Sequence, residues 1–243
     1  MLLTDLENMV RLDLFDPAGP NQRWSQGDID RALDRAVERY SAYYPNIAYV
    51  DMPTQARQRS YPYPTSWNPA YPVLWIERIL YPLVDSAGSM CWPPIERAFS
   101  EFSAMFDAAG AIGGQQPGFT LHLGSAELPQ DGSQLMRVFY ATKHQLDSSG
   151  STIPELHRDL IVAGACAYAM QAYQVPSNDN FDFQDGALHD RLDDTKIPGA
   201  WLAAAGQRLE QFEARLQEIK RQRDYASAAR LHWGDVPRYW SRL

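Results

Sequence analysis

The sequence predicts a mixed α+β protein, mainly α-helical, in which the two terminal regions form a helical bundle with a β-rich insertion between them. Apolar residues recur at three- and four-residue spacing near both ends of the chain. In the middle, short runs of β-branched and aromatic residues replace this pattern. Proline and aromatic residues also crowd between positions 43 and 94, where they disfavour helix.

The N-terminal region carries two helix signals. Thr4, followed by Glu7, predicts a capping box that opens a short helix. Ser25, followed by Asp28, predicts a second capping box and a longer helix that ends at Pro45. The apolar face of this second helix consists of Ile29, Ala32, Leu33, Ala36, Val37 and Tyr40.

The C-terminal region carries two more helix signals. Thr152, with Glu155 three residues later, predicts a helix that runs to about Tyr173. A last long helix is expected from Pro198 to about Arg223. Its heptad-like seam needs a partner in the same chain or in the next one, and it contains Leu202, Ala205, Leu209, Phe212, Leu216 and Ile219.

The middle of the chain predicts strands, which we expect to pair antiparallel because their connections are short. The expected strands cover residues 47–52, 73–80, 119–123 and 135–142. Residues 95–108 fit either a short helix or a further extended piece.

These elements divide the chain into three parts. Residues 1–45 and 151–224 are expected to form the bundle, residues 46–150 the insertion, and residues 225–243 an extended C-terminal tail. We expect the bundle core to contain Ile29, Leu33, Val37, Leu160, Ala163, Ala167, Leu209 and Phe212.

Composition narrows the classes of function. The net charge of −8 argues against a domain that grips nucleic acid through its phosphates. Cys91 and Cys166 lack the spacing of a disulfide framework or a thiolate metal site. The N-terminus lacks the features of a signal peptide, and no apolar run is long enough to cross a membrane.

The search for site chemistry predicts no enzyme, no cofactor and no metal. The histidines lack the i,i+4 spacing of a helical zinc site. An alternative is a small hydrolase built from His144, His157 and the carboxylates of residues 179–194. Another is a carbohydrate- or host-binding module that uses the aromatic residues Tyr61, Tyr63, Trp67, Tyr71 and Trp75.

The C-terminal tail mixes aromatic residues with arginines, the residue types that anchor protein interfaces. It is too short to build a core of its own, so we expect it to dock on another surface. Its candidate interface residues are Tyr225, Arg230, Trp233, Arg238, Tyr239, Trp240 and Arg242.

Three stretches together resemble the head–tail connector proteins of tailed phages. The first runs from Leu3 through Leu14-Phe15-Asp16 to the Trp24-Ser25 cap and the helix ending at Tyr40-Ser41. The second is residues 139–147 running into Ser151-Thr152-Ile153-Pro154. The third is the small-residue helix of residues 159–169, followed by the helix of residues 209–216.

This resemblance implies a structural adaptor that forms a homo-oligomeric ring, often of twelve subunits, in the neck of the virion. The ring would join the portal protein to the stopper or tail proteins and line a channel through which DNA passes without specific binding. The tail would dock on the portal. The protein would be in the host cytoplasm during assembly and in the virion neck afterwards. Another neck protein, such as a stopper or tail terminator, is the alternative within this class.

Overall fold

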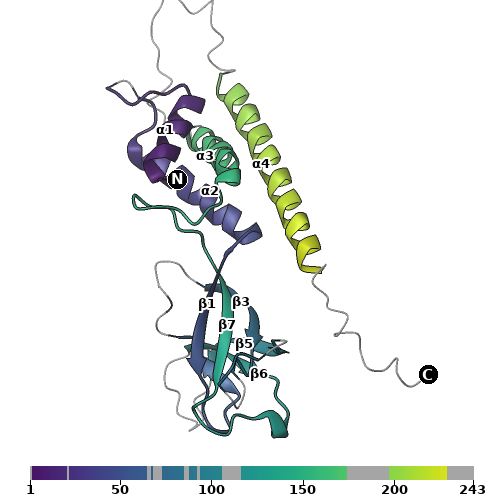
Figure 1. The fold of residues 1–243 in the computed structure, drawn as a ribbon. Helices are drawn as coiled ribbons and strands as arrows, with labels where there is room; N and C mark the ends of the chain where they lie inside the picture. The colour runs from purple at the N-terminus through teal and green to yellow at the C-terminus, as the bar shows by residue number, and fades with distance from the viewer. Residues whose placement is uncertain are drawn as a thin grey trace, which may run out of the picture. The chain divides into compact units, whose positions relative to one another are not determined.

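The chain forms two compact units in the computed structural model (Figure 1). The helical unit contains residues 1–44 and 144–243, and the β unit contains residues 45–143. The structure describes residues 2–20, 22–64, 67, 73–84, 88–91, 94–105, 116–173 and 197–228. Each unit is considered by itself below.

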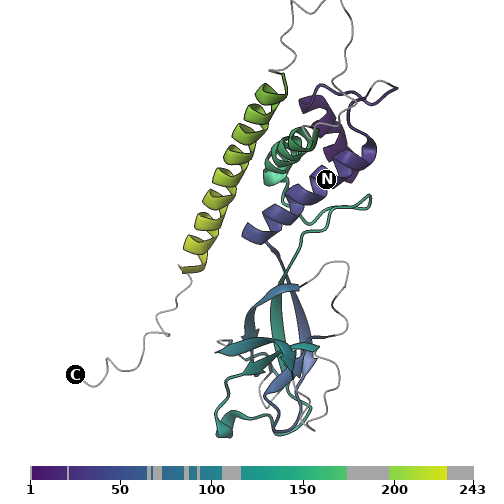
Figure 2. The same ribbon diagram turned by 180° about the vertical axis from the view of Figure 1, so that it is seen from behind.

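The helical unit is organised around α3. Its helices are α1 (Leu3–Asp13), α2 (Gln26–Tyr43), α3 (Arg158–Tyr173) and α4 (Ile197–Ala228), with a short 3-10 helix, η2 (Glu155–His157), leading into α3. Helix α3 contacts α1, α2 and α4. Figures 1 and 2 show α4 running alongside the other helices from both sides.

The helix caps agree with the prediction at one place and differ at two. Ser25 caps α2 as expected, because its side chain accepts a hydrogen bond from the backbone N–H of Asp28 at 3.2 Å. The predicted Thr4 cap is wrong. The N-cap of helix α1 is Leu2, two residues earlier, and the Asp5 side chain accepts a hydrogen bond from the backbone N–H of Leu2 at 3.0 Å.

The predicted Thr152 cap is also wrong. Its hydroxyl oxygen accepts a hydrogen bond from the backbone N–H of Gln145 at 2.9 Å and lies 3.0 Å from Nδ1 of His144. A side chain occupied in this way cannot also satisfy the first N–H groups of a helix. The chain therefore turns through η2 before α3 starts at Arg158.

The predicted bundle core is largely confirmed. Ile29, Leu33, Val37 and Phe212 are buried in one cluster, against which Leu160 and Leu209 pack. Ala167 is also buried, but Ala163 is exposed, so its inclusion in the core was wrong. Leu202 of the predicted seam is 56% exposed. The neighbouring Trp201 faces the bundle instead and lies 6.1 Å from Trp24, measured between ring centroids.

Helices α3 and α4 approach closely because α3 carries small side chains. Gly164 lies directly beneath the ring of Phe212, and a Cβ atom placed on Gly164 would meet that ring at 2.7 Å. Such a distance is well inside van der Waals contact, so only glycine fits here without movement of the ring. The partner that the α4 seam requires is therefore α3 of the same chain, with fewer contacts to α2.

The β unit contains two antiparallel sheets. One sheet has the strand order β1-β7-β3-β4 and consists of β1 (Asn46–Pro53), β7 (Leu135–Thr142), β3 (Val73–Leu80) and β4 (Glu96–Arg97). The other has the order β2-β6-β5, with β2 (Ser60–Pro62), β6 (Gln116–Leu121) and β5 (Phe99–Met105). A further 3-10 helix, η1, covers Ser125–Glu127.

The strands bear out the period-two reading of this region. The bounds of β3 and β7 match the expected strands, and the pairing is antiparallel throughout the described ladders. Of the two alternatives for residues 95–108, the structure shows the extended one, with strands β4 and β5 as far as Met105. The predicted fold class is thus confirmed: N-terminal helices, a β-rich middle with two antiparallel sheets, and C-terminal helices that pack against α2.

The contact between Gly164 and Phe212 yields the first prediction. Gly164→Ala should destabilise the fold by about 1–3 kcal/mol, because the added methyl group overpacks the interface. Gly206→Ala on α4 is the matched control, since nothing lies within 4 Å of its added Cβ atom. This control should gain about 0.5–1 kcal/mol from helix propensity. Urea unfolding of both variants measures the difference, and a stabilised Gly164→Ala protein would contradict the packing.

Candidate functional site

The end of α4 holds the described part of the predicted docking site. Helix α4 has 32 residues, twice the 16 of α3. At a rise of about 1.5 Å per residue it extends roughly 48 Å, so α3 cannot cover its whole length. The buried side chains of α4 lie between Ala205 and Ile219. Beyond Ile219 the helix continues to Ala228.

The last turns of α4 are mostly exposed. Arg223 makes the final described contact with α2, donating to the backbone carbonyl of Tyr43 at 3.4 Å. Asp224 is exposed, and Tyr225 is 79% exposed. Helix α4 ends at Ala228, about five residues past the predicted end at Arg223, so Tyr225 belongs to the helix. The other candidate interface residues lie outside the described residues: Arg230, Trp233, Arg238, Tyr239, Trp240 and Arg242.

A second exposed aromatic residue, Phe15, lies where α1 ends. The backbone N–H of Phe15 donates to the carbonyl of Leu12 at 3.1 Å, and that of Asp16 donates to Arg11 at 3.0 Å. These two hydrogen bonds form a Schellman motif, which usually places glycine at the left-handed position. Here that position is Phe15, with φ of 54°, and its side chain is 92% exposed. Sequence reasoning missed this residue because no glycine marks the turn.

A buried ion pair fixes the loop that follows Phe15. The carboxylate of Asp16 accepts hydrogen bonds from the backbone N–H groups of Arg23 and Trp24, at 2.8 and 3.0 Å. Arg11 lies 3.5 Å from the same carboxylate and also donates to the carbonyl of Trp24. Both charged side chains are almost fully buried. This network satisfies polar groups that would otherwise be costly to bury.

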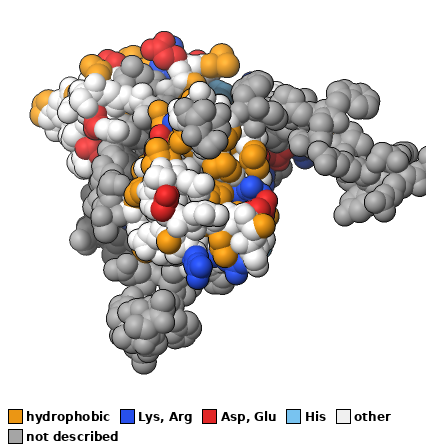
Figure 3. Space-filling view, turned by 60° about the horizontal axis from the view of Figure 1, so that its bottom comes forward, with side chains coloured by type: hydrophobic (Ala, Val, Ile, Leu, Met, Phe, Trp, Pro, Cys, Tyr) orange, Lys and Arg blue, Asp and Glu red, His pale blue; other side chains and the backbone are white. Residues whose placement is uncertain are grey.

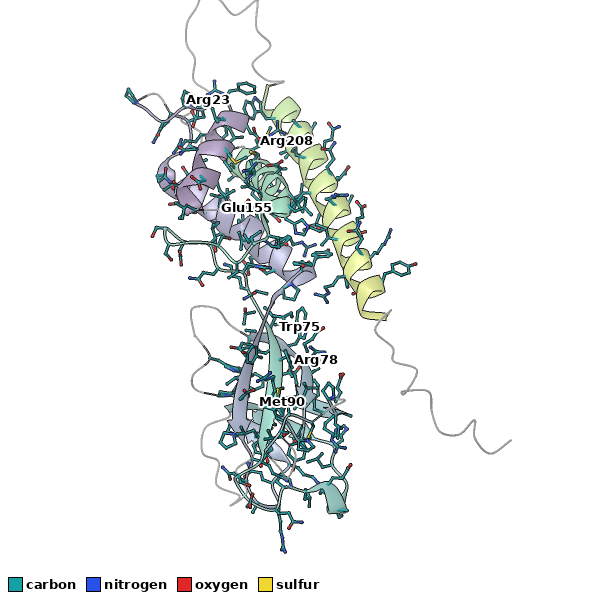
Figure 4. The ribbon with its side chains drawn as sticks, in the orientation of Figure 1. Arg23, Trp75, Arg78, Met90, Glu155 and Arg208 are labelled. Atoms are coloured by element: carbon teal, nitrogen blue, oxygen red, sulfur yellow. The ribbon has the colours of Figure 1, made fainter. Side chains whose placement is uncertain are left out.

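The loop borders an open cavity at this end of the bundle. Its volume is about 570 Å³, and residues 14–20 line it together with Arg23 and Trp201. Arg23, labelled in Figure 4, is one of the lining residues and brings a positive charge. The cavity and the exposed ring of Phe15 thus form a contoured surface with aromatic and cationic character.

The strain at Phe15 yields the second prediction. Phe15→Gly should stabilise the protein by about 0.5–1 kcal/mol, because glycine adopts the left-handed conformation without steric cost. Phe15→Ala keeps the strained backbone and loses only an exposed ring, so its stability should stay near that of the native protein. Thermal unfolding of the two variants distinguishes them. A destabilised Phe15→Gly protein would show that the ring is held by contacts that outweigh the strain.

The structure brings together the two histidines of the hydrolase alternative. The hydroxyl of Tyr40 lies 2.6 Å from Nδ1 of His157, and the Tyr40 ring lies 5.2 Å from that of His144. Both nitrogens of His144 have partners, because Nε2 lies 2.9 Å from the carbonyl of Tyr44 and Nδ1 faces Thr152. Since a carbonyl only accepts, Nε2 carries the hydrogen. A ring engaged in this way orients the structure and has no free nitrogen for a substrate.

The other groups considered for a hydrolase site lie partly outside the described residues. The carboxylates proposed for that site, in residues 179–194, lie outside them. Within the part of the chain that the structure describes, no three His, Cys, Asp or Glu side chains gather in a way that could hold a metal ion. Burial raises the pKa of the Cys166 thiol to about 12, which suppresses the nucleophilic thiolate at neutral pH.

The histidine cluster yields the third prediction. Burial lowers the pKa of His144 and of His157, and the nearby Arg215 lowers that of His157 further. The unfolded chain, whose histidines titrate near pH 6.5, therefore binds protons before the folded protein does as the pH falls. Stability should be full above about pH 6.5 and should decrease below it. Urea midpoints between pH 5 and 8 measure this, and His144→Gln should flatten the slope.

The aromatic residues proposed for carbohydrate or host binding do not form one exposed platform. Tyr61 is buried and stacks on Phe119. Trp67 packs between Tyr63 and Tyr140, with ring centroids 4.6 and 4.5 Å away. Trp75 lies on β3 in Figure 4, with its indole N–H donating to Glu77. Tyr71 lies outside the described residues.

Comparison with known proteins adds no family assignment. No family model matches the chain, and no curated protein is significantly similar to it in sequence. Among the helices that the structure describes, none has the length and apolar character that crossing a membrane requires. The candidate site therefore rests on the geometry of the chain itself.

Proposed function

We propose that the protein is a structural adaptor of a tailed-phage neck, which forms a ring between the portal protein and the stopper or tail proteins. The observation that carries the proposal is the projecting end of α4, with Tyr225 exposed just before an Arg- and aromatic-rich terminus. A helix that extends past its own bundle presents a rigid surface to another protein. Exposed aromatic residues beside arginine are the usual anchors of such contacts.

The helical unit supports the same role. Its core is closed by α3 and α4 within one chain, so the exposed aromatic residues Phe15 and Tyr225 are surplus to folding. The mixed α+β fold agrees with the resemblance to head–tail connectors, which rests on stretches in both terminal helical regions and on residues 139–154 between them. The net charge of −8 suits the wall of a channel that DNA passes through, because like charge repels the phosphates. Stoppers and tail terminators are richer in strand, so the helical termini favour an adaptor.

The fourth prediction tests portal docking. Tyr225→Ala, and separately a chain that ends at Ala228, should bind purified portal rings at least about tenfold more weakly than the full chain, as expected for loss of interface anchors. Leu202→Ala is the matched control, because Leu202 is also a large exposed side chain, 56% exposed, and lies near the opposite end of the same helix. Its binding should be unchanged.

Co-sedimentation with portal rings measures the affinity, and circular dichroism establishes that each variant is folded. Native mass spectrometry of the complex then counts the adaptor subunits, for which a ring of about twelve copies is expected from the resemblance. Undiminished docking of the chain ending at Ala228 would refute the assignment of the tail as the portal-binding segment.

A further inference from the structure

The free edge of β1 in the β unit is unusually regular. Strand β1 lies at one edge of its sheet, with β7 as its only neighbour in the described ladder (Figure 1). It pairs with β7 over its whole length, from Asn46 opposite Thr142 to Pro53 opposite Leu135, without a bulge. By contrast, the pairing of β7 with β3 shows two register shifts.

The ladder determines which backbone groups of β1 face the free edge. The N–H of Thr54 donates to the carbonyl of Gln134 directly opposite, which marks that position as a hydrogen-bonded pair. In an antiparallel ladder such pairs alternate, so the even-numbered residues of β1 bond to β7. The N–H and C=O groups of Ile47, Tyr49 and Asp51 therefore point away from β7. In the described part of the chain, these groups have no hydrogen-bond partner on that side.

The features that usually protect an edge strand are missing from β1. Protective edges carry lysines, inward charges, prolines or bulges. Strand β1 has no Lys or Arg, and its single proline, Pro53, is the last residue. Its one charged side chain, Asp51, is neutralised by two hydrogen bonds from Arg137, at 2.7 and 2.8 Å. Arg137 accordingly holds the pKa of Asp51 below its usual range.

The side chains of Ile47 and Tyr49 form an exposed apolar row on β1. Ile47 is 46% exposed and Tyr49 is 59% exposed. The Tyr49 ring is held in place by Phe139 across the ladder, with centroids 5.9 Å apart, and by the guanidinium of Arg137 at 4.5 Å. Figure 4 marks Arg78 on β3, whose guanidinium lies 4.3 Å over the ring of Phe139. Figure 3 shows one face of the molecule, on which hydrophobic side chains lie beside basic and acidic ones.

We propose that β1 pairs antiparallel with β1 of a second copy of this chain, centred on Tyr49. This register places Tyr49 opposite Tyr49 of the other copy and Ile47 opposite its Asp51. The free-edge N–H and C=O groups of Ile47, Tyr49 and Asp51 then find partners, because odd-numbered residues lie opposite odd-numbered residues and form the hydrogen-bonded pairs of the new ladder. The two aromatic rings meet across the new ladder, as favourable cross-strand pairs do. Asp51 does not face its own counterpart, so no like charges are opposed.

The self-pairing is possible because the free N–H and C=O groups of β1 are spaced evenly on both sides of Tyr49. Two antiparallel copies of the strand can therefore satisfy each other's free groups. A two-fold contact of this kind joins two chains or two rings, whereas a closed ring uses head-to-tail contacts. It therefore goes beyond the proposed adaptor function and does not depend on it. The contact is small compared with interfaces of about 1,200–2,000 Å², so the isolated pair should be weak and concentration-dependent.

Cysteine cross-linking tests the register. In a Cys91→Ser background, Tyr49→Cys should form an intermolecular disulfide under mild oxidation, because opposed residues of a hydrogen-bonded pair lie about 5.5 Å apart at Cα. Ile47→Cys alone should not cross-link. A mixture of Ile47→Cys and Asp51→Cys chains should cross-link as heterodimers. Together the three outcomes identify one register.

A backbone block supplies an independent readout. The variant Tyr49→Pro removes the central N–H from the free edge of β1. The β1–β7 pairing, which begins at Asn46 and Thr142, uses the other edge of the strand. Sedimentation velocity should show dimers of the native chain at high concentration and at least a tenfold weaker association of Tyr49→Pro, equal to about 1.4 kcal/mol. Tyr49→Thr, which keeps the N–H and suits a strand, should retain the association. Cross-linking at Ile47 alone, or equal association of Tyr49→Pro and Tyr49→Thr, overturns the proposal.

Discussion

The close approach of α3 and α4 at Gly164 and Phe212 is the constraint on which the helical unit depends. The ring of Phe212 occupies the space where any other residue at position 164 would place its Cβ atom. This contact sets the distance between the two helices and allows Leu216 to reach the same core. Because α3 also contacts α1 and α2, its small side chains decide how the whole bundle closes. Because α3 is half as long as α4, it covers only part of α4. The end of α4 that α3 does not cover is the projecting end.

Local signals predicted the elements that depend on local chemistry. The Ser25 cap and the bounds of β3 and β7 followed from residue type and spacing, because caps and period-two strands are determined within a few residues. Contacts between distant residues could not be predicted in this way. Thr152 left its expected cap because Gln145 and His144 occupy its hydroxyl in the folded chain.

The candidate site shows the same division. Tyr225 was predicted from composition, and its exposure on α4 agrees with a role in docking. Phe15 was missed because its left-handed backbone depends on the Schellman hydrogen bonds and on the buried pair of Arg11 and Asp16. Strain and exposure at one residue both cost free energy, and such outliers cluster where a protein contacts its partners or ligands. Phe15 and Tyr225 are therefore the two exposed aromatic residues from which the proposed docking surfaces are argued.

Hydrogen–deuterium exchange of α4, in the free protein and on portal rings, tests the central claim most directly. Residues 205–219 are packed on α3 and should be protected in both states, because their exchange requires opening of the core. Residues 224–228 lie beyond the last described contact of α4 with α2 and should exchange rapidly in the free protein, then become protected on the portal ring. Equal exchange of residues 224–228 in the two states, alongside demonstrated binding, would contradict the claim that the projecting end of α4 carries the docking surface.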